Sequence, residues 1–154
     1  MSRTLDIEAS TRQTLAFMNR ILAIFAIALL AGCASTGHQF AAPGTDWKSA
    51  TGQLRYKGGG FTVIGDLLVS KGADGARLDF SKGPGLSLMR VQSDKTHIRF
   101  EGRMARGTRV YARGTKLPSY LGAWGLLEED AGKVRSRTIS YGDDTLSYQL
   151  PPLR

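Results

Sequence analysis

The chain has 154 residues and a formal net charge of +8, a length that allows one domain with appendages. Its content of 42% apolar and 22% charged residues is ordinary for a globular protein. The 19 glycines follow no G-X-Y period, which excludes collagen and favours a turn-rich protein. Because the sequence has a single cysteine, an intramolecular disulfide is also excluded.

Residues 1–32 have the pattern of a signal peptide. An unbroken apolar run extends from Ile21 to Leu30, follows the basic Arg20, and ends in small residues. A membrane-spanning helix needs about 20 apolar residues, so this run is too short to be a permanent span. Asp6 and Glu8 are unusual in such a signal, and Met18 opens a more compact one. We therefore expect translation to start at Met18.

The end of the signal, Leu30-Ala31-Gly32-Cys33, resembles the lipobox of bacterial lipoproteins. The resemblance implies cleavage before Cys33 and attachment of a diacylglyceryl group to its thiol. Two or more acyl chains give stable membrane anchoring. In the lipoproteins that this segment resembles, an Asp after the cysteine signals retention in the inner membrane. Here Ala34 follows, which favours the outer membrane, with the protein facing the periplasm.

The mature chain is divided into a tether and a folded domain by its composition. Residues 33–50 are rich in small and polar residues and are predicted to be a flexible tether. Residues 51–154 are predicted to form one β-rich domain. The last four residues, 151–154, are interpreted as a free end.

The domain alternates apolar and polar residues with a period of two, and its spacers are rich in Gly, Asp, Ser and Pro, which favours short antiparallel strands. We therefore predict a mainly β fold, with a curved antiparallel sheet or half-barrel and one short helix. Leu117, Leu121 and Trp124 have helical spacing and place that helix in residues 117–127, where it would cover one opening of the sheet. In another predicted strand Val110 and Ala112 alternate with Arg109, Tyr111 and Arg113. The predicted apolar face comprises Phe61, Val63, Leu67, Leu78, Phe80, Leu86 and Leu88.

The pattern of alternating hydrophobic residues and glycines in residues 65–69, 76–80, 85–91 and 100–102 resembles that of the LolA/LolB lipoprotein-localisation family. The resemblance covers about residues 51–113. It implies a curved antiparallel sheet around a lipid-binding hollow, and the lipobox matches LolB, since LolA is soluble. No functional residue is carried over from it.

No catalytic or metal-binding constellation emerges from the sequence. His38 lies in the predicted tether and His97 on the polar face of a predicted strand, so no zinc site or other cofactor is expected. Asp143 and Asp144 follow Gly142 and are interpreted as turn residues. No G-x-S-x-G elbow is present. We therefore expect a protein that is not an enzyme.

The positive charge is concentrated in residues 90–116, which contain eight basic and two acidic residues and so carry 8 − 2 = +6. Such a field attracts anionic partners. Export removes the protein from nucleic acid and leaves anionic lipid head groups, lipopolysaccharide phosphates or an acidic protein. A merely solvated basic face is the alternative. The candidates for anion binding are Arg99, Arg103, Arg106, Arg109 and Arg113.

Two functions remain open on the sequence. The first is a lipid- or lipoprotein-binding module of the cell envelope, whose hollow holds one acyl chain with Leu121 and Trp124 at its mouth. The second is an envelope assembly, interaction or inhibitor lipoprotein with a filled core and a basic binding face. An apolar concave face supports the first, and the arginine-rich stretch supports the second.

The lipobox generates a direct prediction. The substitution Cys33→Ser removes the thiol that would carry the lipid, so radiolabelled palmitate should no longer be incorporated and the signal should stay uncleaved or the protein should become soluble. Palmitate labelling that is unchanged by the substitution would show that this segment is not a lipobox.

Overall fold

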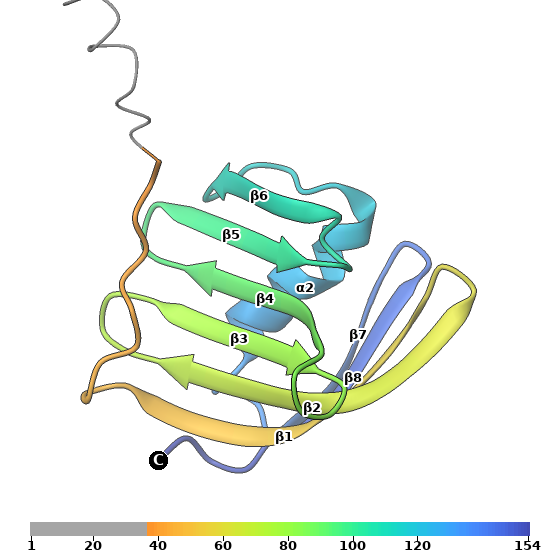
Figure 1. The fold of residues 1–154 in the computed structure, drawn as a ribbon, viewed down its shortest axis with the longest axis horizontal. Coiled ribbons are helices and arrows are strands. Elements are labelled where there is room, and N and C mark those ends of the chain that lie inside the picture. Colours follow the sequence, from red (N-terminus) through yellow and green to blue (C-terminus); the bar gives the residue numbers. More distant parts are fainter. Residues whose placement is uncertain (1–36) are drawn as a thin grey trace, which may run out of the picture. The chain divides into compact units, whose positions relative to one another are not determined.

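The computed structural model describes residues 37–154, and the compact unit that carries the fold is Gln39–Arg154. The predicted signal peptide and Cys33 lie outside the described residues. The unit contains one helix, α2 (Ser119–Asp130), among its described residues (Figure 1). Its strands are β1 (Lys48–Gly58), β2 (Phe61–Lys71), β3 (Ala76–Ser81), β4 (Ser87–Ser93), β5 (His97–Gly102), β6 (Gly107–Ala112), β7 (Ser136–Tyr141) and β8 (Asp144–Gln149).

The strands form one antiparallel sheet in the order β6-β5-β4-β3-β2-β1-β8-β7. The two longest strands, β1 and β2, pair along their full length, from Lys48 opposite Lys71 to Gly58 opposite Phe61. The sheet does not close, because β6 and β7 do not pair with each other. The predicted fold class, a curved antiparallel sheet with one short helix, is confirmed.

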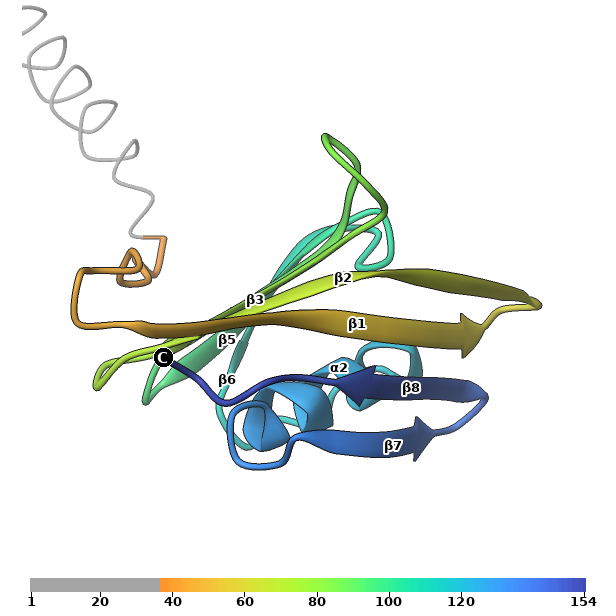
Figure 2. The ribbon, with the colours of Figure 1, turned by 90° about the horizontal axis from the view of Figure 1, so that it is seen from below.

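The concave side of the sheet is filled by α2. Figure 2 shows the helix between the β7–β8 hairpin and the part of the sheet that contains β5 and β6. Trp124 is 1% exposed, and its ring lies 6.0 Å from the ring of Tyr56 and 5.6 Å from that of Phe80. Leu121 and Leu127 are fully buried beside it. One helix therefore supplies the side chains that an open sheet needs on its apolar face.

The predicted apolar face is wrong at the start of β2, where Phe61 is 50% exposed, and in β4. In β4 the fully buried residues are Met89 and Val91, whereas Leu86 precedes the strand and Leu88 is only partly buried. The reason is a bulge: Phe80 pairs with Met89 but Ser81 pairs with Ser87, so Leu88 is an extra residue. One extra residue reverses the facing of the side chains beyond it.

In β6 the face that packs on the core carries Tyr111, whose ring contacts that of Phe100 at 6.1 Å. Val110 and Ala112, which alternate with polar residues in the sequence, are exposed, with Val110 at 46%. β6 is an edge strand, and an edge strand can present apolar side chains to solvent. Alternation alone therefore does not identify its buried face.

Both ends of the compact unit are more ordered than expected. The first strand begins at Lys48, inside the predicted tether. The interpretation of residues 151–154 as a free end is also wrong. The backbone N–H of Ser49 donates to the carbonyl of Arg154 at 2.9 Å, and the N–H of Arg154 donates to the carbonyl of Ser49 at 3.2 Å. Leu153 packs against the core.

The helix begins after Pro118, which occupies the N-cap position, and runs to Asp130, three residues beyond the predicted end. Its two glycines allow close packing. A Cβ at Gly122 would lie 2.3 Å from ring atoms of Tyr141, and one at Gly125 would lie 2.6 Å from Leu117 Cδ1. Within residues 37–154, no helix has the length and apolar character needed to cross a membrane.

The position of Trp124 predicts a large effect of its removal. Trp124→Ala should lower the free energy of unfolding by about 3–5 kcal/mol, because it leaves a cavity where Tyr56 and Phe80 now pack. Urea unfolding measures the effect. The control is Leu126→Ala on the same helix, whose side chain is 39% exposed; it should cost about 1 kcal/mol or less. Equal losses for both variants would contradict the proposed packing.

Candidate functional site

A pocket of about 220 Å³ lies at one end of the curved sheet; we call it the mouth pocket. It is built where the β1–β2 turn, the β5–β6 turn, the start of α2 and the start of β8 come together. This convergence collects aromatic, basic and acidic side chains from distant parts of the sequence. The lining residues are Tyr56, Gly59, Phe61, Arg103, Met104, Arg106, Tyr120, Trp124 and Asp144.

The aromatic wall of the pocket combines rigid and solvent-facing rings. Tyr56 and Trp124 are stacked, with centroids 6.0 Å apart and an interplanar angle of 20°. Phe61 leans on Tyr56 at 5.4 Å and is 50% exposed. Such pairs contribute about 0.5–1.5 kcal/mol beyond burial. Phe61 therefore presents apolar surface to solvent and is held in place by the packed rings of Tyr56 and Trp124.

Two arginines line the pocket from the β5–β6 turn. Both Arg103 and Arg106 are exposed, and neither forms an ion pair with a carboxylate of residues 37–154. Arg106 has φ +56°, and no other non-glycine residue in the described part of the chain has a positive φ. This conformation costs about 1–3 kcal/mol and places the guanidinium carbon 4.7 Å from the ring centroid of Tyr120.

An acid completes the pocket. Asp144 is 7% exposed and accepts a hydrogen bond from the Tyr56 hydroxyl at 2.9 Å. Burial, this hydrogen bond and the negative charge of Asp144 together raise the pKa of Tyr56 to about 12, against a small lowering by Arg106. Tyr56 therefore stays protonated at neutral pH and acts as the donor.

The backbone opposite Asp144 leaves room for this pair. A Cβ at Gly58 would lie 1.9 Å from Asp144 Oδ1 and 2.4 Å from the Tyr56 hydroxyl oxygen. Only glycine fits at that position. Trp124 adds an unsatisfied donor, because its buried indole N–H has no acceptor within the described residues. Buried polar groups of this kind are rare in proteins and call for an explanation.

The predicted lipid-binding residues divide between the pocket and the core. Phe61 and Trp124 line the mouth pocket, and Val63 is partly buried. Leu67, Leu78, Phe80 and Leu121 are 0–1% exposed within the core cluster. Leu121 is thus in the core, away from the predicted mouth. The side chains of the sheet and of α2 occupy the space in which a hollow for an acyl chain was predicted.

The predicted basic residues do not form one face. Arg99 pairs with Glu101 at 2.8 Å. Arg113 binds both carboxylate oxygens of Glu128, at 2.8 and 3.1 Å, and Glu128 also accepts from the Ser93 hydroxyl at 2.6 Å. Burial of Glu128, whose side chain is 5% exposed, makes this a structural ion pair. Arg103, Arg106 and Arg109 remain without carboxylate partners among the described residues.

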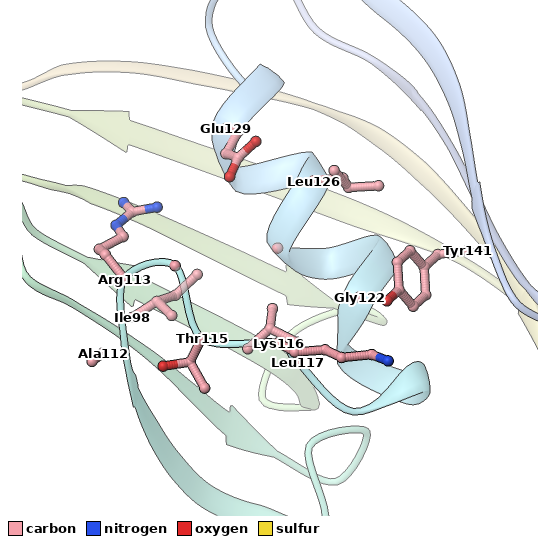
Figure 3. Close-up of a pocket in the computed structure, with 12 residues that line it drawn as sticks. Ile98, Ala112, Arg113, Thr115, Lys116, Leu117, Gly122, Leu126, Glu129 and Tyr141 are labelled. Carbon is pink, nitrogen blue, oxygen red and sulfur yellow. The ribbon is translucent and has the colours of Figure 1, made fainter.

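A second concavity of about 220 Å³, the edge groove, lies between α2 and the segment that follows β6 (Figure 3). Leu117 and Leu126 give it apolar walls, and Gly122 and Gly125 line it from the helix. The contacts of these glycines with Tyr141 and Leu117 account for their presence. We interpret the edge groove as a packing seam between the helix and the edges of the sheet.

The comparisons with known proteins add no assignment: the sequence matches no protein-family model and no curated protein. The mouth pocket therefore has to be interpreted from its own chemistry.

Sequence reasoning missed Tyr56, Tyr120 and the role of Asp144. A signal for two of them was present. Tyr56 lies two residues after Leu54 in β1, and is therefore expected on the same face of the strand. Asp144 precedes Leu146 and Tyr148 at intervals of two residues in β8, and is likewise expected on their face. Extending the alternation by one step at each strand end places both on the buried face. Asp144 was instead interpreted from the turn that precedes it.

The Tyr56–Asp144 pair predicts a titration. In the wild-type protein Tyr56 should titrate near pH 12, and in Asp144→Asn its pKa should fall, because both the charge and the strong acceptor that raise it are lost. Tyrosine ¹³C NMR of the labelled protein measures both values. Since the pKa is raised above the unfolded value of about 10, this group's stabilisation is complete below pH 10 and disappears as the pH rises toward 12. An unchanged Tyr56 pKa in the variant would contradict the pair.

Proposed function

We propose that this protein is a lipid-anchored lipoprotein of the cell envelope that faces the periplasm, and that it binds an amphiphile with an anionic group at the mouth pocket. The anchor is the lipid on Cys33, in the outer membrane. The protein acts as a binding module rather than as an enzyme. The partner carries an apolar group and an anionic group, as an acyl lipid or a lipoprotein does.

The observation that carries this proposal is that predicted lipid-binding residues and predicted anion-binding residues line the same pocket. Phe61 and Trp124 came from the apolar alternation, and Arg103 and Arg106 came from the basic stretch. All four line the mouth pocket. An exposed aromatic surface beside two arginines without carboxylate partners suits a ligand that is apolar on one side and anionic on the other.

The character of the lining favours binding over catalysis. The pocket contains no Ser, Cys or His, and its acid is held by a tyrosine. A nucleophile with an adjacent base is therefore missing from its lining. The filled interior also changes where the ligand would lie: contact at the rim replaces an acyl chain enclosed by the sheet.

The filled core is also compatible with a second function. The protein would then be an assembly, interaction or inhibitor lipoprotein that uses its basic surface. Arg103, Arg106 and Arg109 would then contact an acidic protein. This alternative predicts that the arginines matter and that lipid is absent, so the following experiment separates the two functions.

Native mass spectrometry of the full-length protein, released from detergent micelles, tests the proposal. The protein should retain a non-covalent lipid that carries a phosphate or another anionic group, in addition to its covalent anchor. Arg103→Ala with Arg106→Ala should reduce the retained fraction by about tenfold or more, because a hydrogen bond to a charged group contributes about 1.5–3 kcal/mol.

The matched control is Arg55→Ala with Arg135→Ala, which removes two exposed arginines that do not line the mouth pocket. Lipid retention should be unchanged in this variant. Equal losses in both double variants would indicate unspecific charge attraction. No retained lipid in the wild-type protein would exclude the amphiphile and favour the interaction protein.

A further inference from the structure

The two buried carboxylates of the described residues are treated differently by the fold. Glu128 is neutralised by Arg113 and bound by Ser93. Asp144, equally buried, has one hydrogen bond from a neutral hydroxyl and no ion pair within residues 37–154. A buried charge is costly unless it is paired, so Asp144 is an incomplete site.

Asp144 lacks an ion pair although basic side chains line the same pocket. Arg103 and Arg106 line the same pocket, but Arg106 lies over the ring of Tyr120 instead of binding the carboxylate. The pocket therefore holds an acid and two bases without joining them. Separated charges of opposite sign fit a ligand that carries both signs at a similar spacing.

The pocket is also built around the carboxylate. Gly58 is required because any side chain there would collide with Asp144 Oδ1 and with the hydroxyl of Tyr56. Tyr56 donates to Oδ1, which leaves the lone pairs of Oδ2 for another donor. The arrangement keeps Asp144 oriented and supplies only part of its hydrogen bonding.

We propose that the mouth pocket recognises a zwitterionic head group in which a primary ammonium stands close to a phosphate. The ammonium donates to Asp144, and the phosphate binds Arg103 and Arg106. This inference rests on the proposed function for the place where the ligand binds, and it adds the chemical class of the head group. The source is a lipid head group or a free phosphorylated amine.

The rings of the pocket favour a primary ammonium over a quaternary one. A quaternary ammonium needs open aromatic faces, because it has no N–H to donate. Here the face of Tyr120 is covered by Arg106, and Tyr56 and Trp124 are stacked on each other, so the exposed Phe61 is a single ring and no cage of several rings surrounds a cation. A primary ammonium instead uses hydrogen bonds, and Asp144 offers an acceptor. The volume of about 220 Å³ suits a head group and not a whole lipid.

The test uses the full-length protein with its anchor, labelled with 5-fluorotryptophan, in micelles of a non-ionic detergent. The sequence contains two tryptophans, so ¹⁹F NMR gives one signal from Trp124 in the pocket and one from Trp47 as an internal control. O-phosphoethanolamine, phosphocholine and inorganic phosphate are titrated in turn. The Trp124 signal should shift with O-phosphoethanolamine at a Kd at least tenfold lower than with the other two probes.

Asp144→Asn should abolish this preference and leave the weaker phosphate binding, whereas the neighbouring exposed Asp143→Asn should change nothing. The unshifted Trp47 signal and thermal unfolding verify that each variant is folded. In a second arm, nanodiscs that contain phosphatidylethanolamine should shift Trp124 without any soluble probe if the source is a lipid. If only the soluble probe shifts the signal, the ligand is a free phosphorylated amine.

Equal affinity for phosphate and O-phosphoethanolamine, or an Asp144→Asn variant that keeps the preference, overturns the head-group inference while the proposed function stands. Tighter binding of phosphocholine overturns the choice of a primary ammonium. If no probe binds at the pocket but lipid is retained in the mass spectra, the head-group inference alone fails. If lipid is also absent there, the proposed function fails with it.

Discussion

The apolar concave face of an open sheet has to be kept from water, and in this protein the task falls to one helix of twelve residues. Trp124 is the central contact, since its ring packs on both Tyr56 and Phe80 and so joins β1 to β3 through the helix. Close approach is possible because Gly122 and Gly125 present no side chain to Tyr141 and Leu117. The filled interior, the narrow edge groove and the position of the mouth pocket all follow from this packing.

The charged residues beside the two ends of the helix are arranged differently. At its C-terminal end Glu128 is neutralised by Arg113, and Lys71 donates to the Glu128 backbone carbonyl at 3.2 Å. Burial lowers the pKa of Lys71, partly offset by the charge of Glu128. At the N-terminal end the charges of Asp144 and Arg106 are kept apart. The fold thus completes its ion pairs at one end of the helix and leaves them incomplete at the other end, which is where we propose that the ligand binds.

The sequence predicted the parts of the fold that depend on local periodicity. Antiparallel strands, turns and a single helix follow from alternation, glycines and the spacing of Leu117, Leu121 and Trp124. The buried face of β4 could not be predicted, because the bulge at Leu88 depends on how Ser81 and Ser87 pair across strands. The candidate site was predicted only in part. Phe61, Trp124, Arg103 and Arg106 were chosen, but their meeting depends on three segments that are distant in sequence. Asp144 was taken for a turn residue.

The backbone pairing of Ser49 with Arg154 has a mechanical consequence. A pull on the chain that precedes the sheet enters at Lys48 and acts along β1, which lies between β2 and β8 and not at an edge. The hydrogen bonds of an antiparallel pair are perpendicular to the strands, so this pull loads many of them in shear at once instead of opening them one after another. The two backbone hydrogen bonds between Ser49 and Arg154 add to the resistance of β1 to this pull. Tension on the chain that precedes β1 would thus be shared by the strands on both sides of it.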